Sequence, residues 1–203
     1  MRKLDNSFYN RGDVLQIARE LLGKIVVTKF EGKITSGMIV ETEAYVAVTD
    51  RASHSFAGKR TARNEQMYAA AGTTYVYICY GMHQMLNVVT NAKDVPDAIL
   101  LRAIEPVEGV DLMLQRTGKA IADFTLTKGP GNVAKALGIS KKHSGLKFTG
   151  TEIFICTKGD SLIPREFMGT SKRIGVEGAG TDASLLYRFY IKGNKFVSGR
   201  PVK

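Results

Sequence analysis

Two acidic residues and a tyrosine occupy alternate positions of one short run, Ile39 to Tyr45. The apolar residues that lead into this run are typical of a β-strand, and side chains two positions apart on a strand point to the same face. Glu41, Glu43 and Tyr45 are therefore predicted to share one face. Carboxylates placed in this way are suited to general acid–base catalysis.

A second extended run, Thr73 to Tyr80, alternates tyrosines with aliphatic residues. The alternation predicts that Tyr75 and Tyr77 lie on one side of the strand, which gives it a wet, aromatic face. Tyr80 is expected at the strand end, because Gly81 beside it permits a sharp turn.

The segment between the two runs, His54 to Asn64, is polar, basic and too irregular for a strand or a long helix. It is interpreted as a functional loop. Together Tyr45, His54 and Tyr77 could stack on a flat ring such as a purine, and their electron-rich rings would favour a cationic one. Each could instead have a simpler role, the tyrosines in the core and His54 in solvent.

Two further polar residues stand in apolar runs. Arg102 interrupts the predicted strand Ala98 to Ile104, where it could form a salt bridge to a carboxylate at the core edge or contact a phosphate near an active site. Asn87, in the extended run from Leu86 to Thr90, could be an ordinary turn former. The residues alone leave these alternatives open.

Glu43 is the residue predicted to carry catalysis, as a general base that activates water. Glu41 is expected to pair with a nearby arginine or lysine. Two other classes of protein remain open. Glu41 and Glu43, about 7 Å apart along a strand, could be the acid and nucleophile of a sugar hydrolase, although the absence of tryptophan and the basic charge argue against a sugar cleft. The tyrosines could also stack on single-stranded bases in a non-catalytic nucleic-acid binder.

Composition sets independent bounds. The 203 residues favour one domain with a substantial core. A net charge of +10, spread along the chain, favours binding to a polyanion such as DNA or RNA. Cys79 and Cys156 are too few for a disulfide framework and show no zinc-site spacing, which predicts a reduced, cytoplasmic protein without a metal. No run is long and apolar enough for a membrane, and the N-terminus lacks the apolar core of a signal peptide.

The pattern of elements follows in chain order. Asp13 is placed to cap a helix that begins at Val14, and the turn at Glu31 to Lys33 leads from one strand into the strand that carries the acids. Pro106 is predicted to start a helix that continues to Gln115. Hairpin spacing favours a largely antiparallel sheet, so the fold class is mixed α/β (α+β) with helices around the sheet. Further elements are expected in these segments: a short helix from Val133 to Leu137, and strands at Thr151 to Thr157 and Tyr187 to Lys192.

These segments together resemble the alkyladenine (3-methyladenine) DNA glycosylases, which excise damaged purines from duplex DNA. The resemblance covers nearly the whole chain, from Val14 to the run ending at Tyr190. Its matching segments are Ile39 to Tyr45, His54-Ser55, Thr61 with Arg63-Asn64, Gly72-Thr73, Tyr75 to Met82, Asn87, and Leu100 to Pro106. One position departs from the family pattern, because Asn132 stands where a basic residue is usual after the glycines of Lys128 to Gly131.

The resemblance implies a role for each candidate residue. Tyr80 matches the residue that intercalates into DNA, and Asn87 resembles the one that crowds the exocyclic amine of guanine. The resemblance favours a phosphate contact near the active site as the role of Arg102. It also places Tyr45, His54 and Tyr77 around the extruded base. The implied substrates are 3-methyladenine, hypoxanthine and ethenoadenine in double-stranded DNA. The implied protein is a monomer with a curved sheet and one domain over residues 1–203, which uses no cofactor and leaves an abasic site without cutting the strand.

Overall fold

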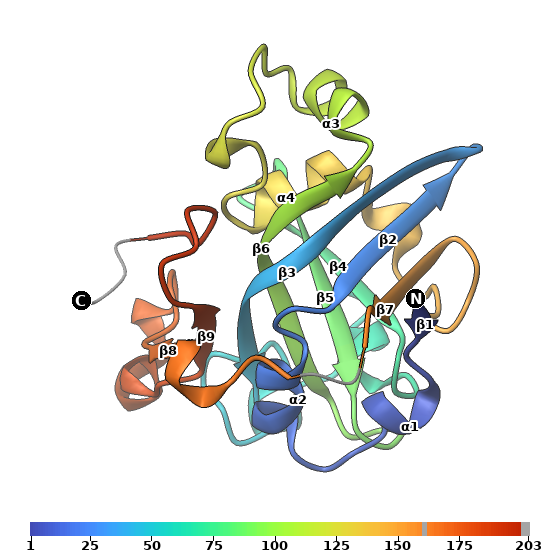
Figure 1. Ribbon diagram of the computed structural model, residues 1–203. Coiled ribbons are helices and arrows are strands. Elements are labelled where there is room, and N and C mark those ends of the chain that lie inside the picture. Colours follow the sequence, from blue (N-terminus) through green and yellow to red (C-terminus); the bar gives the residue numbers. More distant parts are fainter. Residues whose placement is uncertain (160–161, 200–203) are drawn as a thin grey trace.

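A computed structural model describes residues 1–159 and 162–199. Nine strands form one sheet in the order β1-β7-β2-β3-β6-β5-β4, with β9 paired to β3 and β8 paired to β9 (Figure 1). Every strand pairing is antiparallel. The strands are β1 Arg2–Lys3, β2 Ile25–Phe30, β3 Lys33–Tyr45, β4 Thr74–Cys79, β5 His83–Thr90, β6 Asp97–Glu108, β7 Ile153–Thr157, β8 Met168–Ser171 and β9 Arg188–Ile191.

The helices are short and lie around the sheet. In Figure 1, α1 and α2 lie below the sheet and α3 stands above it, at the end of β6. The α-helices are α1 Asn6–Tyr9, α2 Val14–Glu20, α3 Val110–Thr117 and α4 Pro130–Leu137. The 3₁₀ segments are η1 Phe56–Gly58, η2 Glu65–Tyr68, η3 Phe124–Leu126, η4 Lys141–His143, η5 Arg165–Phe167 and η6 Glu177–Ser184.

Strand β3 is the centre of the sheet. One of its edges pairs with β2 along its first half and with β9 from Glu41 to Glu43, while its other edge pairs with β6. Neighbours on both edges, with helices and loops over the faces, bury almost the whole strand from Thr35 to Ala44. The acids predicted to do chemistry therefore sit in the most constrained part of the fold.

The turn into β3 was predicted correctly. Glu31 and Gly32 have φ angles of 54° and 73°, so both adopt the left-handed conformation that a two-residue hairpin turn requires. Phe30 and Lys33 pair across the turn. This turn fixes the register of the β2–β3 hairpin.

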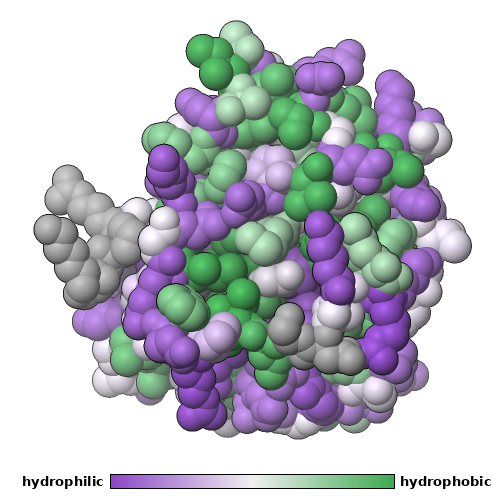
Figure 2. Space-filling model, viewed as in Figure 1, coloured by the Kyte–Doolittle hydropathy of each residue, from purple (hydrophilic) through white to green (hydrophobic). Residues whose placement is uncertain are grey.

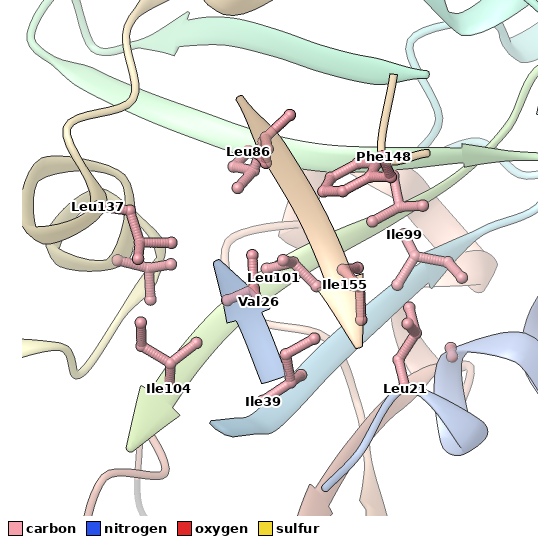
Figure 3. Packing of buried hydrophobic residues seen from close by; sticks show 14 of the residues in the cluster. Leu21, Val26, Ile39, Leu86, Ile99, Leu101, Ile104, Leu137, Phe148 and Ile155 are labelled. Carbon is pink, nitrogen blue, oxygen red and sulfur yellow. The ribbon is translucent and has the colours of Figure 1, made fainter. Parts of the chain in front are cut away.

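The first helix and the core also match the prediction. The Asp13 side chain accepts a hydrogen bond from the Gln16 amide, which caps α2. The apolar face of α2 enters a core between the sheet and the helices, where Leu21 lies near Ile39 and Ile99 (Figure 3). At the other end of this core, Leu137 of α4 packs near Ile104.

The predicted helix start at Pro106 is wrong. Strand β6 continues through Pro106 to Glu108, and α3 begins only at Val110, after Gly109. Pro106 pairs with Gly37 of β3 next to a register shift between Ser36 and Gly37. Proline lacks an N–H group and is tolerated in sheets at such irregularities.

The fold class is confirmed: the protein has a mixed α/β architecture with a largely antiparallel sheet. On the face shown in Figure 2, hydrophilic and hydrophobic residues are interspersed. Within residues 1–159 and 162–199, no helix is long and apolar enough to cross a membrane. The assignment of all 203 residues to one domain stays a prediction, since residues 160–161 and 200–203 lie outside the described part.

Candidate active site

An aromatic pocket opens beside the end of β3. Its volume is about 170 Å³. Four of the residues predicted to bind substrate line it, namely Tyr45, His54, Tyr77 and Asn87. The other lining residues are Ala52, Arg63, Met67, Tyr75, Cys79, Ala98, Gly175 and Val176.

Three rings form one side of the pocket. Tyr75 and Tyr77 lie on the same face of β4, as predicted, with ring centroids 5.5 Å apart. The His54 ring meets Tyr77 edge-on at 4.6 Å, and its Nδ1 is 2.8 Å from the Tyr75 hydroxyl. These contacts hold the rings in place without filling the space between them and Tyr45.

The His54 ring is neutral at physiological pH. Burial, with the nearby cations Arg63 and Lys59, lowers the pKa of His54 to about 4. The loop that carries it is held by Asn64, whose side-chain amide donates to the backbone carbonyls of His54 and Lys59 at 2.8 Å. The polar segment from His54 to Asn64 is therefore an ordered wall of the pocket.

Asn87 enters the pocket from β5. Its side-chain N–H groups donate to the backbone carbonyls of Tyr75 and Met85, at 3.1 and 3.2 Å. Two hydrogen bonds to fixed backbone groups leave the amide little freedom to rotate. Asn87 is thus a rigid part of the pocket rim.

Glu43 lies behind Tyr45 and does not line the pocket. Its side chain is fully buried, and its Oε2 accepts a hydrogen bond of 2.9 Å from the Tyr45 hydroxyl. Its Oε1 accepts one of 2.8 Å from the Ile174 amide. Burial raises the pKa of Glu43, and the Arg102 cation and these hydrogen bonds oppose the rise.

Arg102 lies beneath the two acids. Its Nε donates to Glu41 at 3.0 Å and its Nη1 to Glu43 at 3.3 Å, and the residue is 6% exposed. Glu41 also pairs with Arg188. The expectation that Glu41 pairs with an arginine is confirmed, and of the two alternatives for Arg102 the structure contains the salt bridge.

Two irregularities in the β3–β6 pairing lie next to these groups. Ile39 pairs with Ile104 and Glu41 with Ala103, so the register passes over Val40. Thr42 then pairs with Leu101, and the register passes over Arg102. Bulges of this kind bend a strand and re-aim its side chains, which explains how an arginine from an apolar strand reaches both acids.

A buried ion pair borders the other side of Tyr45. Arg173 pairs with Asp50 through both terminal nitrogens. Its guanidinium lies over the rings of Tyr45 and Tyr187, at 4.8 and 5.3 Å from the centroids. The same residue precedes Ile174, so this pair fixes the segment that delivers an amide to Glu43.

Tyr80 lies outside the pocket, at the tip of the β4–β5 hairpin. Cys79 and His83 pair across the three-residue loop, in which Tyr80 and Gly81 have φ angles of 50° and 70°. The Tyr80 side chain is 83% exposed and Met82 is 72% exposed. The predicted position at a strand end is confirmed, and the structure excludes a core role for this tyrosine.

Residues from the C-terminal third were missed by the sequence interpretation. Arg188 and Ser198 donate hydrogen bonds to Glu41, and Arg173 lies over the ring of Tyr45. Each lies more than 120 positions from its partner in the sequence. The sequence does carry a signal for Arg188, because this residue is a single charge in an otherwise apolar strand. Arg102 shows the same pattern. Nothing in the local sequence marks Ser198.

The glycine-containing turn at Lys128 to Gly131 leads into α4, as predicted. Asn132, where the family pattern has a basic residue, donates to the carbonyls of Thr125 and Lys128 at 3.2 and 2.9 Å. Its amide therefore secures the turn from inside. Across the described residues, no three His, Cys, Asp or Glu side chains gather as metal ligands do.

Comparison with known proteins identifies the family of the chain. Residues 7–195 match the family described as Methylpurine-DNA glycosylase (MPG). A relative from Clostridium perfringens (strain 13 / Type A) is 42% identical over 97% of this chain and 98% of its own length. Another, from Desulfitobacterium hafniense (strain Y51), is 42% identical over 98% of this chain and 99% of its own, and both bear the provisional name 3-methyladenine DNA glycosylase. The chain therefore belongs to the methylpurine-DNA glycosylase family.

Proposed function

We propose that this DNA glycosylase, as an enzyme of base excision repair, takes alkylated or deaminated purines out of duplex DNA and hydrolyses their bond to the sugar. The aromatic pocket receives the extruded base, and Glu43 supplies the general base. The observation that carries the proposal is the hydrogen bond from the Tyr45 hydroxyl to Glu43, because Tyr45 also lines the pocket. One side chain joins the place for the purine to the buried carboxylate.

The chemical step is a displacement at the sugar C1′. The bond from C1′ to the purine nitrogen breaks, and its electron pair leaves with the purine. Water forms the new bond to C1′ and gives its proton to Glu43. The ionised carboxylate also stabilises the positive charge that builds on the sugar.

The charge of the purine decides whether the departing base must also be protonated. A base made cationic by alkylation, such as 3-methyladenine, becomes neutral when it accepts the electron pair. Hypoxanthine and ethenoadenine start neutral and need a proton on the departing ring. One carboxylate therefore suffices for the first class, and the second depends on protonation by another donor.

Three residues would select and hold the flipped nucleotide. Tyr45 and Tyr77 offer flat faces for stacking, and Asn87, fixed by two backbone carbonyls, would crowd the exocyclic amine of guanine. Tyr80 would enter the gap in the base stack, since its exposed ring stands at the hairpin tip. The basic loop with Lys59 and Arg63 favours the approach of a phosphate backbone.

Glu43 is buried in the free protein, so the mechanism requires a path for water. The carboxylate is bordered by the Tyr45 hydroxyl and the Ile174 amide. We infer that seating of the base against Tyr45 opens access to Oε1, the oxygen that accepts only the Ile174 amide among the described residues. Exclusion of bulk water before that moment strengthens the electrostatic interaction of Glu43 with Arg102 in a low-dielectric site.

The sugar-hydrolase alternative is not favoured. Its mechanism needs two carboxyls that both face the substrate. Glu41 instead accepts hydrogen bonds from Arg102, Arg188 and Ser198, all within the protein. These donors engage both of its oxygens, so the carboxylate is held within the protein.

The test measures release of free base from duplexes that contain hypoxanthine or ethenoadenine and from methylated DNA that contains 3-methyladenine. The enzyme is kept in excess, and the base is quantified by chromatography. Glu43→Gln should lower excision by about 10²–10⁴-fold, the usual range for a positioned general base, and keep binding to the lesion duplex. Glu65→Gln, an exposed glutamate paired with Arg60, is the matched control and should excise at the wild-type rate.

Two results would contradict the proposal. Near-normal excision by Glu43→Gln would remove Glu43 from the mechanism. Tight binding to lesion duplexes with no base released by the wild-type protein would favour the non-catalytic nucleic-acid binder.

A further inference from the structure

Four buried charged side chains meet beneath the pocket. Glu41 and Glu43 are fully buried, and Arg102 and Arg188 are 6% and 3% exposed. They come from β3, β6 and β9, which are adjacent in the sheet. Two negative and two positive charges balance, which is the condition under which ionised groups can be buried together.

The two acids differ in how their oxygens are used. Glu41 accepts four hydrogen bonds: on Oε1 from Arg102 Nε, Arg188 Nε and Ser198 Oγ, at 3.0, 2.6 and 2.8 Å, and on Oε2 from the Ser198 amide at 2.7 Å. A carboxylate offers about four acceptor sites. Both oxygens of Glu41 are therefore engaged by donors within the protein.

Glu43 has a smaller set of donors. Among the described residues it accepts from the Tyr45 hydroxyl, from Arg102 Nη1 and from the Ile174 amide. One of its roughly four acceptor sites remains for another donor. Within the described residues Glu41 thus accepts four hydrogen bonds and Glu43 three.

The orientation of Arg102 depends on Glu41. Its Nε is bound by Glu41, and its Nη2 donates to Ser198 Oγ at 3.2 Å, the same hydroxyl that donates to Glu41. These contacts fix the guanidinium plane, and the remaining nitrogen, Nη1, reaches Glu43. Without Glu41, the carboxylate partner of the arginine among the described residues would be Glu43 alone.

We propose that Glu41 is a positioning residue for base excision: it anchors Arg102 in the plane that reaches Glu43 and balances the charge of Arg188, so that Glu43 keeps its basicity. The inference rests on the proposed role of Glu43 as general base. It assigns no direct contact with substrate to Glu41.

The charge balance acts on Glu43 from several elements. Ionisable groups from five parts of the fold face Glu43. They are Glu41 and Tyr45 on β3, Tyr77 on β4, Arg102 on β6, Arg173 after β8, and Arg188 on β9, whose backbone lies opposite Glu43 in the β3–β9 register. Loss of the Glu41 charge leaves the arginines in excess. The ionised form of Glu43 then becomes easier to keep, its pKa falls, and it becomes a weaker base.

The experiment compares Glu41→Gln with Glu41→Gln combined with Arg188→Met, which restores the charge balance without restoring the anchor for Arg102. Single-turnover excision of hypoxanthine is measured across pH 4–9, together with lesion-duplex binding and melting temperature. Glu41→Gln should move the acid limb of the profile about 1 unit lower, lower the plateau at least about 10-fold, and leave binding unchanged. The double variant should return the limb towards wild type and keep the low plateau.

Three outcomes would overturn the inference. The first is a Glu41→Gln profile with the wild-type limb and plateau. The second is a wild-type plateau in the double variant, since anchoring of Arg102 would then be dispensable. The third is a uniform loss at every pH with a lowered melting temperature, the pattern of a purely structural residue. If Glu41→Gln does not fold, the charge-balanced double variant still tests the anchor through its plateau.

Glu43→Gln in the same assay separates the role of Glu41 from that of Glu43. If Glu43→Gln is inactive and Glu41→Gln behaves as wild type, only the role of Glu41 fails. If Glu43→Gln excises hypoxanthine normally, the proposed function of Glu43 itself is wrong.

Discussion

The hydroxyl of Tyr45 donates a hydrogen bond of 2.9 Å to Oε2 of Glu43. Burial, followed by the nearby Glu43 charge, raises the pKa of Tyr45, so the hydroxyl keeps its proton and remains a donor. The hydrogen bond favours the ionised carboxylate and thereby holds down the pKa of Glu43. A residue of the pocket wall consequently influences the pKa of Glu43, the proposed general base.

Replacement of Tyr45 by phenylalanine should separate this tuning from stacking. Tyr45→Phe keeps the ring but removes the donor, so the acid limb of the pH profile for excision should move up by about 1 unit. Tyr45→Ala, which also loses the ring, should in addition weaken binding to lesion duplexes. A Tyr45→Phe profile that moves down in pH, or stays in place, would show that the hydrogen bond does not act on the proposed general base.

Glu43 should cost the protein stability at neutral pH. Its pKa in the folded state is raised above the usual 4.5, so its contribution favours folding at low pH and is lost as the pH rises through the folded-state pKa. Glu43→Gln should therefore melt higher than wild type at pH 7.5, by about 2–4 °C for each kcal/mol gained in a chain of this length. The difference should shrink as the pH falls below about 4, where the carboxyl becomes protonated in the unfolded state as well. Calorimetry that found the variant less stable at pH 7.5 would contradict this sign.

Tyr80 should act only on paired DNA. Tyr80→Ala removes an exposed side chain, so the melting temperature should not change. The flipped state should lose roughly 1–3 kcal/mol, the scale of one stacking contact. The loss should shrink for a lesion opposite a mismatch or a gap, where less unstacking work is needed. Single-turnover excision on paired and mispaired hypoxanthine tests this, and an equal loss on both substrates would count against the wedge.

The buried pair of Asp50 and Arg173 should matter far more to stability than a surface pair. Asp50→Asn leaves an uncompensated guanidinium between two tyrosine rings, and the free energy of unfolding should fall by about 3–5 kcal/mol. Glu65→Gln, which breaks an exposed pair with Arg60, should cost much less stability. Denaturant titration of both variants measures the contrast. Equal losses would show that the Asp50 pair has no special role in holding the segment with Ile174.

The local pattern of the sequence was sufficient for the elements that carry the site. Alternation placed Glu41 and Glu43 on one face and Tyr75 and Tyr77 on another, because the period of a strand is a local property. Glu31 and Gly32 marked the turn for the same reason. These predictions depended on residues within a few positions of one another.

The surroundings of Glu43 could not be predicted in this way. Ile174 and Ser198 reach the acids only because β9 pairs with β3, a contact between distant parts of the chain. The predicted helix start at Pro106 was wrong for a related reason. The place of Pro106 in β6 depends on a register shift in the pairing with β3, which local propensity does not encode. The roles of Tyr45, His54, Tyr77, Asn87 and Arg102 towards substrate stay predictions.

The conformation of the β4–β5 tip has a consequence for how the protein would search a chromosome. Tyr80 and Gly81 are already in the left-handed conformation in the free protein, and the Met82 amide closes the loop on the Cys79 carbonyl at 3.2 Å. A wedge that is extended before any encounter needs no trigger and loses little conformational freedom on insertion. The exposed ring would instead contact each base pair as the protein slides along the duplex. These contacts would raise the energy barrier to each sliding step. Diffusion along the duplex should then be slow, and each base pair should be probed as the protein passes it. A more flexible hairpin tip would let the protein diffuse faster and miss more lesions.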